Sequence, residues 1–160
     1  MQVLVIYYSK TGKTKKLAEY IADGVHEVEG IECLLKPVSE ATEDDFLSSG
    51  GVIAGSPVYM GTMAAQLKEY FEKLHDFRKK MDEKVGAAFA TSTDPSGGKE
   101  TTIFSILQAM IIFGMIVVGD PMDATGHYGV SCAGYPDERV ASNAAKLGKR
   151  VALLTKKLKS

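Results

Sequence analysis

The segment MQVLVIYYSKTGKTKKLAEYIADGV, residues 1–25, decides the fold. Its apolar run at residues 3–8 leads through a short polar loop, residues 9–14, into a stretch whose apolar side chains recur at helical spacing. These side chains are Leu17, Tyr20, Ile21 and Val25. A continuous apolar strand followed directly by an amphipathic helix is typical of a parallel sheet that helices cover on both faces.

The same alternation continues along the rest of the chain. Further apolar or β-branched runs predict strands at residues 31–38, 51–55, 85–91 and 115–119. Helical patterns follow at residues 67–77, 103–113 and 140–158, and residues 39–49 have room for one helical turn near 44–47. The pattern predicts a single α/β domain over residues 1–160, a three-layer sandwich with a parallel sheet and right-handed crossovers.

Composition argues against several classes of protein. The chain has 160 residues, 45% hydrophobic and 24% charged, which is typical of one globular domain. A net charge of −1 argues against a nucleic-acid binder. Cys33 and Cys132 lie in no metal-ligand pattern, so we expect no metal site and a reduced, cytoplasmic protein. The apolar segment 103–118 is shorter than the about 20 residues of a membrane span, and residues 1–6 look like a strand and not a signal peptide.

Four loops are candidates for the functional site, because ligands of such sheets lie beyond the carboxyl ends of the strands. The first loop, residues 9–14, combines three hydroxyls, a glycine and the start of a helix, which together suit a phosphate group. Its end resembles a P-loop, but that motif needs a glycine at position 7, where this chain has Tyr7. The alternative interpretation is an ordinary turn in which Ser or Thr caps the helix.

The other three loops carry residues that suit a flat ring. Tyr59 could stack on a planar heterocycle while backbone amides of residues 56–62 meet its polar edge, although a packing role is the alternative. The loop at 92–98 is small and polar, and can follow a ligand closely. The long loop at 120–136, which has no clear element, contains His127 and Tyr128. These two could contact a hydride acceptor or donate a proton to one, or His127 could simply be exposed.

Taken together, the loops resemble those of a known family. The strings YYSKTGKT at 7–14, AGSPVYMGTMAAQLKEYF at 54–71 and GGKETT at 97–102 are similar to those of the flavodoxin-like superfamily. The closest resemblance is to its WrbA-type NAD(P)H:quinone oxidoreductase branch. It implies a five-stranded parallel sheet in the order 2-1-3-4-5, FMN as cofactor, NADH or NADPH as electron donor and a quinone as acceptor.

The resemblance also assigns residues to the cofactor and to catalysis. It implies FMN contacts from Ser9, Lys10, Thr11, Gly12, Lys13, Thr14, Pro57, Val58, Tyr59, Met60, Gly61, Thr91, Ser92, Thr93, Asp94 and Gly97. Tyr128 and the following glycine match a pair that the branch places over the open face of the flavin, so His127 and Tyr128 are the expected catalytic residues. An active-site histidine of the branch falls at Ile112 in this chain.

Two other classes of function stay open. A flavodoxin-type electron carrier would bind FMN without turning over a substrate of its own, but such carriers are usually strongly acidic. A phosphoacceptor signalling domain would need carboxylates at the ends of the first and third strands to hold Mg²⁺. Those ends carry Tyr8-Ser9 and Gly55-Ser56 instead.

The helix predicted over residues 103–113 is apolar nearly all the way round. Since an outer helix of a sandwich normally has a polar face, we expect this helix to form a subunit contact in a homodimer or homotetramer. The alternative is that the long loop at 120–136 folds over it. We expect no nucleic-acid or membrane partner, and a small-molecule quinone as electron acceptor.

Overall fold

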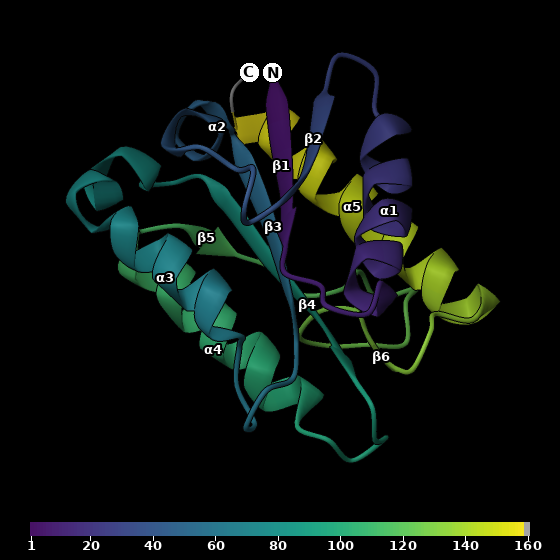
Figure 1. Ribbon diagram of the computed structural model, residues 1–160. Coiled ribbons are helices and arrows are strands. Elements are labelled where there is room, and N and C mark those ends of the chain that lie inside the picture. Colours follow the sequence, from purple (N-terminus) through teal and green to yellow (C-terminus); the bar gives the residue numbers. More distant parts are fainter. Residues whose placement is uncertain (159–160) are drawn as a thin grey trace.

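The structure is a computed structural model in which we describe residues 1–158 (Figure 1). Strands and helices alternate along the chain, as expected. In order they are β1 (Gln2–Tyr7), α1 (Lys13–His26), β2 (Glu32–Pro37), α2 (Glu43–Ser48), β3 (Gly51–Pro57), α3 (Ala65–Lys73), the 3₁₀ helix η1 (His75–Met81), β4 (Val85–Ser92), α4 (Lys99–Ile112), β5 (Ile116–Val117), β6 (Ser131–Ala133) and α5 (Glu138–Leu158).

The strands form one parallel sheet in the order β2-β1-β3-β4-β5, which confirms the predicted order 2-1-3-4-5. β1 lies between β2 and β3, and its residue Tyr7 pairs with Pro37 on one side and with Gly55 on the other. The carboxyl ends of β1 and β3 therefore meet at one rim of the sheet, together with the end of β4.

The fifth position in the sheet is shared by two short strands, of which the sequence analysis predicted only the first. β5 pairs with Val85 and Gly86 at the start of β4, and β6 pairs with Ala90, Thr91 and Ser92 at its end. The strand expected at 115–119 ends at Val117, and the carbonyls of Gly119 and Asp120 accept hydrogen bonds from Arg150 and not from a neighbouring strand. The long loop, expected to lack any element, contains β6.

Helices cover both faces of the sheet, which confirms the three layers (Figure 1). Val3 and Val5 of β1 pack with α1 and α5, and the alternate residues Leu4 and Ile6 pack on the side of α3 and α4. Both faces of β1 are therefore buried, as its unbroken apolar run predicted.

Two glycines allow α1 and α5 to touch along their backbones. A Cβ atom on Gly24 would lie 1.8 Å from the carbonyl oxygen of Ala145, and one on Gly148 would lie 2.0 Å from that of Ile21. Only a residue without a side chain fits at either position, so the contact fixes the distance between the two helices.

Three details differ from or refine the sequence analysis. The helical pattern expected at 67–77 ends at Lys73, and the 3₁₀ helix η1 follows from His75. The single helical turn expected near 44–47 is α2, which Thr42 and Asp45 cap reciprocally. None of the described helices combines the length and the apolar character that crossing a membrane requires.

Candidate cofactor site

The loop after β1 leaves the first turn of α1 open to a ligand. The N-cap of α1 is Gly12, in a left-handed conformation with φ 88°, and its N–H donates to Ser9 Oγ at 3.2 Å. In the described part of the chain no side chain caps this helix, so the alternative in which Ser or Thr caps it is wrong. Because the first amides of a helix need acceptors and carry partial positive charge, this end suits an anion.

Three of the four candidate loops meet at one cavity of about 130 Å³. Its lining residues are Lys10, Thr11, Lys13, Thr14, Pro57, Val58, Tyr59, Thr91, Ser92 and Thr93, all of which the resemblance had assigned to the cofactor. Two hydrogen bonds hold the loops together here. The hydroxyls of Thr14 and Thr91, both buried, lie 2.8 Å apart, and the N–H of Val58 donates to the Thr91 carbonyl at 2.8 Å.

The loop after β3 forms a tight two-residue turn at the rim. Tyr59 and Thr62 exchange two backbone hydrogen bonds of 3.0 and 3.1 Å, while Met60 and Gly61 between them have φ values of 51° and 78°. Such a turn favours glycine, and Met60 accepts the strained conformation at a fully exposed tip. The Thr101 hydroxyl of α4 donates to the Gly61 carbonyl at 2.7 Å, so α4 also holds this turn in place.

The loop after β4 is organised by Asp94. Its carbonyl accepts from the Ser92 hydroxyl at 2.6 Å and from the Gly97 N–H at 3.0 Å, and its carboxylate accepts from the Ser96 N–H at 2.8 Å. Asp94 therefore shapes the backbone of the loop, and a Cβ on Gly97 would lie only 2.8 Å from the Asp94 carbonyl oxygen. Asp94 and Gly97 do not line the 130 Å³ cavity, nor do Ser9, Gly12, Met60 and Gly61.

One residue that holds the site together was not predicted. The hydroxyl of Tyr135, just after β6, donates to the carbonyl of Thr11 at 3.1 Å and lies next to Gly12. The two residues are 124 positions apart, and only the pairing of β6 with β4 brings them close. No local pattern in the sequence indicates this contact.

His127 and Tyr128 lie apart from the three converging loops. They line a second cavity of about 240 Å³, beside Asp120, Arg139 and Asn143, which shares no lining residue with the first. The Tyr128 ring packs against Phe104 of α4, with ring centroids 4.6 Å apart. The structure thus brings ten of the sixteen residues expected to hold the cofactor to one cavity. The two expected to be catalytic line another cavity, and their role stays a prediction.

The long loop between β5 and β6 is fastened to α5 at three points. Arg150 donates to the carbonyls of Gly119 and Asp120 at 3.0 and 2.5 Å, and Asn143 donates to the Thr125 hydroxyl at 2.7 Å. The Lys146 ammonium donates to the Asp123 carbonyl at 2.7 Å. These contacts hold residues 119–125 against the helix.

Asp120 is a buried carboxylate beneath this loop that the sequence analysis passed over. Among residues 1–158 neither of its oxygens has a hydrogen-bond partner of good geometry. Burial raises the pKa of Asp120 to about 6, while the Gly129 backbone amide, Arg150 and His127 act in the opposite direction. A Cβ on Gly126 would lie 1.9 Å from Asp120 Oδ2, so the loop folds closely around the carboxyl group.

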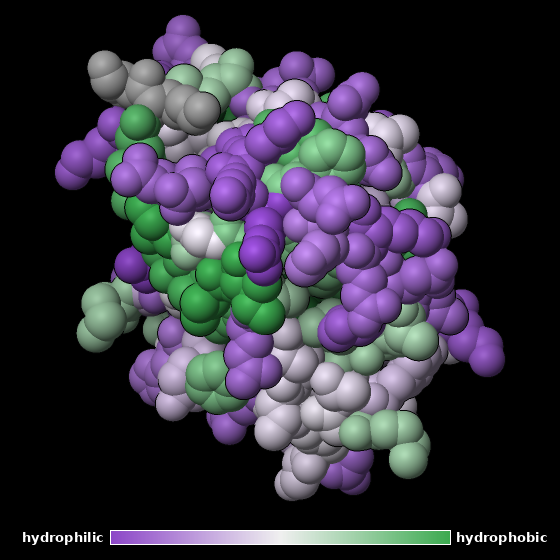
Figure 2. All heavy atoms as spheres, turned by 90° about the vertical axis from the view of Figure 1, so that its left-hand side faces the viewer, coloured by the Kyte–Doolittle hydropathy of each residue, from purple (hydrophilic) through white to green (hydrophobic). Residues whose placement is uncertain are grey.

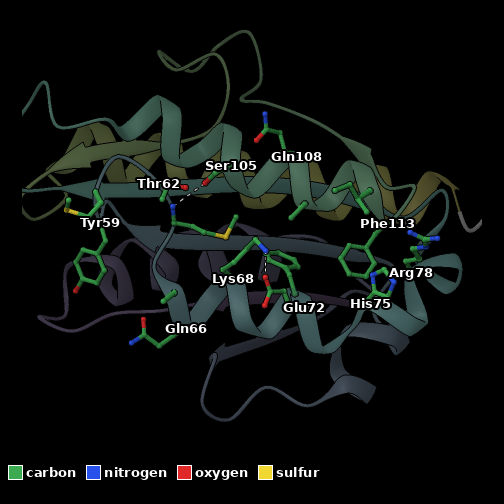
Figure 3. A pocket seen from close by; sticks show the side chains of 16 residues that line it. Tyr59, Thr62, Gln66, Lys68, Glu72, His75, Arg78, Ser105, Gln108 and Phe113 are labelled. Atoms are coloured by element: carbon green, nitrogen blue, oxygen red, sulfur yellow. Dashed lines mark hydrogen bonds and ion pairs between the residues drawn. The ribbon is translucent and has the colours of Figure 1, made fainter.

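A larger groove of about 810 Å³ runs between α3 and α4 (Figure 3). Tyr59 and Thr62 lie at one end of it, and His75 and Arg78 lie at the other. Tyr59 lines both this groove and the 130 Å³ cavity, so the two are neighbours.

The residues of the first cavity fit the cofactor that the resemblance implies. Lys10 and Lys13, the Thr14 hydroxyl and the open first turn of α1 provide the positive charge and the donors that a phosphate monoester needs. Among residues 1–158 no atom lies within 4 Å of a Cβ built on Gly61, so the turn beside Tyr59 is open on this side. The rim can therefore hold a phosphate at one side and a planar group at the other.

Comparison with known proteins points to the same cofactor. A family model described as NADPH-dependent FMN reductase matches residues 1–128. The chain is 40% identical over 158 residues to a flavodoxin of Aquifex aeolicus (strain VF5), covering 94% of this chain and 85% of that one. It is 33% identical over 189 residues to an NAD(P)H dehydrogenase (quinone) of Archaeoglobus fulgidus, covering 98% of both.

Among solved structures, a flavodoxin, WrbA-like protein from Agrobacterium tumefaciens superposes with a TM-score of 0.84. The superposition covers 98% of each chain at 22% sequence identity. A likeness at that identity shows that the fold is shared.

Proposed function

The chain belongs to the NADPH-dependent FMN reductase family, and from this premise we propose that it carries two electrons from NAD(P)H through bound FMN to a quinone. Membership confirms the resemblance that the sequence strings indicated, and with it FMN as cofactor and NAD(P)H as electron donor. The quinone is the proposed part. It is supported by the Archaeoglobus relative, whose name is NAD(P)H dehydrogenase (quinone).

The observation that carries the proposal is the cavity where three loops converge. In the overall reaction NAD(P)H and one proton reduce the quinone to a hydroquinone and leave NAD(P)⁺. Bound FMN would supply the two-electron chemistry, so that the two substrates could bind in turn. The protein's own part is to hold the phosphate with α1 and the two lysines, and to surround the ring with fixed backbone amides that stabilise negative charge.

Tyr128 is the proposed contact to the second substrate, with His127 beside it. Tyr128 is 44% exposed and rests on Phe104, outside the cavity of the three loops. We also propose a homo-oligomer, and Tyr128 and His127 remain at the surface of the single chain. No acid or base is required of either residue, because the flavin performs the chemistry.

A flavodoxin-type electron carrier is the second candidate, and the Aquifex relative named flavodoxin favours it. A carrier would bind FMN but would not couple NAD(P)H oxidation to a small acceptor. The net charge of −1 provides little of the long-range attraction by which a carrier finds a basic partner. We therefore place the enzyme first.

The test is to purify the protein with FMN and to follow NADH and NADPH oxidation with and without benzoquinone. We expect benzoquinone to stimulate oxidation well above a blank of free FMN. A protein that binds FMN and shows no turnover above the blank would be the carrier, and a protein that does not bind FMN would contradict both candidates.

A glycine variant links this activity to the proposed site. Gly12→Ala places a side chain at φ 88° in the phosphate loop, so we expect FMN affinity to fall at least about tenfold. Gly30→Ala is the matched control, since Gly30 has φ 82° but lies between α1 and β2, away from the cavity. It should lower stability similarly and leave FMN affinity unchanged.

We also propose a cytoplasmic location. Cys33 and Cys132 are both free, which suits a reducing compartment. Burial raises the pKa of Cys33 to about 12 and that of Cys132 to about 11, so neither thiol is activated as a nucleophile.

A further inference from the structure

The groove between α3 and α4 begins at the cofactor site. Tyr59 belongs to both, and Met60, Thr62 and Met63 continue the lining away from the 130 Å³ cavity. Along α4 the lining residues are Ser105, Gln108, Ala109 and Ile112, which recur on one face of the helix. At 1.5 Å per residue, this face is about 10 Å long. The groove is thus elongated, and it leads from the candidate cofactor site along the surface of the protein.

The floor of the groove is apolar. Met63, Phe71 and Phe113 are buried side chains in its lining, and the half-buried Ala109 packs against the same core cluster. The polar group on the floor is already satisfied within the protein, because the Ser105 hydroxyl accepts from the Met63 N–H at 3.2 Å and donates to the Thr102 carbonyl at 2.7 Å. A ligand here therefore needs no polar group of its own.

Charged side chains border the groove on the side of α3. The ammonium of Lys68 pairs with the carboxylate of Glu72 along the helix, and both are exposed (Figure 3). Figure 2 shows this face of the molecule, where strongly apolar residues gather beside hydrophilic ones. Ile112 is 67% exposed here, an unfavourable position for a large apolar side chain unless something covers it.

We propose that the groove binds the apolar tail of a prenylated quinone whose ring is reduced at the neighbouring cofactor site. This inference rests on the proposed quinone reduction and names the class of quinone. The ring would lie beside Tyr59, and the first isoprene units would cover Ala109 and Ile112. A pocket of several hundred Å³ with an apolar lining is typical of a site for a ligand of this size.

The shape of the groove favours a narrow chain over a second copy of the protein. A two-fold contact would place the same patch of both subunits against each other, so that one hollow would face another. The same contact would also remove from water the exposed ion pairs of α3, Lys68–Glu72 and Lys73–Glu69. Phe104 and Ile111, the apolar residues on the other side of α4, do not line the groove and remain available for a subunit contact.

The test compares quinones that share one ring and differ only in their tail. We expect the benzoquinone with one or two isoprene units to have a KM about 10–100-fold lower than the same ring without a tail. Complete burial of the five carbons of one isoprene unit would lower KM further than this, but the groove is open on one side. If the ring without a tail is not reduced at all, the proposed function fails. If it is reduced and the tail leaves KM unchanged, the groove proposal alone is overturned.

Two variants locate the effect in the groove. Ala109→Phe fills the floor of the groove, and Ile112→Ser removes apolar surface from it. For each variant we divide kcat/KM for the tailed quinone by kcat/KM for the tailless one, and we expect this ratio to fall at least about fivefold. Leu153→Ser, at an exposed apolar position of α5, is the matched control and should leave the ratio as it is. FMN absorbance and circular dichroism identify variants that have not folded.

Either of two results would overturn the assignment. One is an unchanged ratio in both groove variants. The other is a change of oligomeric state in Ile112→Ser, which gel filtration would detect and which would make the groove a subunit interface.

Discussion

Asp120, only 6% exposed, makes the stability of the protein depend on pH. Its pKa of about 6 in the folded chain lies above the ordinary value of 3.8, so the folded state binds its proton more tightly than the unfolded state does. Ionisation of this group therefore disfavours folding. The penalty is absent at low pH, grows as the pH rises between about 4 and 6, and is constant above that range.

We expect Asp120→Asn to raise the free energy of unfolding by up to about 3 kcal/mol at pH 7.5. The gain should shrink below about 1 kcal/mol at pH 4, where the wild-type carboxyl is protonated in the folded state. Urea unfolding of the wild type and the variant at pH 7.5 and pH 4 measures the gain at each pH. Asp23→Asn, at an exposed position of α1, is the control and should change stability little at either pH. An equal effect of Asp120→Asn at pH 4 and pH 7.5 would contradict the assignment.

At the scale of helices, the contact between α1 and α5 depends on Gly24 and Gly148. A glycine inside a helix normally weakens it, so replacing one by alanine usually stabilises a protein. Here the added methyl group would overlap with a carbonyl oxygen of the facing helix. The two helices would have to separate.

We therefore expect Gly148→Ala to destabilise the protein by about 2–3 kcal/mol, the opposite sign from the usual effect. Ser142→Ala, at an exposed position of the same helix, should change stability by only a few tenths of a kcal/mol. The midpoint of urea unfolding reports the change in stability for each of the two variants. If Gly148→Ala proves as stable as the wild type, the close approach of the two helices is not what the structure indicates.

The elements that the sequence predicts well are those with unbroken local patterns. β1, β3 and β4 are buried on both faces, and their apolar runs are therefore continuous; α1 and α5 each have one apolar face. β6 has only three residues, and it exists because its backbone completes the end of β4. A strand this short has no periodicity of its own, so a single sequence cannot indicate it.

The candidate site likewise contains residues that the sequence could indicate and residues that it could not. The three loops that follow long strands were predicted to meet because the carboxyl ends of parallel strands share one rim, and their residues line one cavity. Tyr135 could not be found, because its contact with Thr11 depends on β6. Asp120 looks like an ordinary loop residue in the sequence, and only the fold of the loop around it shows that it is buried.

At the scale of the whole molecule, α4 presents apolar side chains to solvent on two sides. Phe104 and Ile111, which are 41% and 57% exposed, lie two helical turns apart on one of them. The long loop covers this side in part, since Tyr128 packs on Phe104, but all three side chains stay exposed. We define Phe104 and Ile111 as the outer strip and propose it as the subunit contact, with Tyr128 beside it.

The protein should elute from gel filtration as a dimer or tetramer of the 17.2 kDa chain. Phe104→Ser combined with Ile111→Ser should convert it to a monomer, because the contact loses its large apolar side chains. Ile112→Ser and Leu153→Ser, which lie off the outer strip, should leave the oligomer intact. A wild-type monomer at all concentrations would refute the contact.

The two edges of the sheet add a constraint on how this protein can associate. At one edge, β2 carries the charged residues Glu32 and Lys36 and ends in Pro37, which has no N–H to offer. At the other, β5 and β6 are two short pieces separated by a loop that is fastened to α5. Neither edge presents a long, flat row of free backbone groups on which a foreign strand could extend the sheet. The sheet edges therefore disfavour amyloid-like growth, even though α4 exposes apolar side chains.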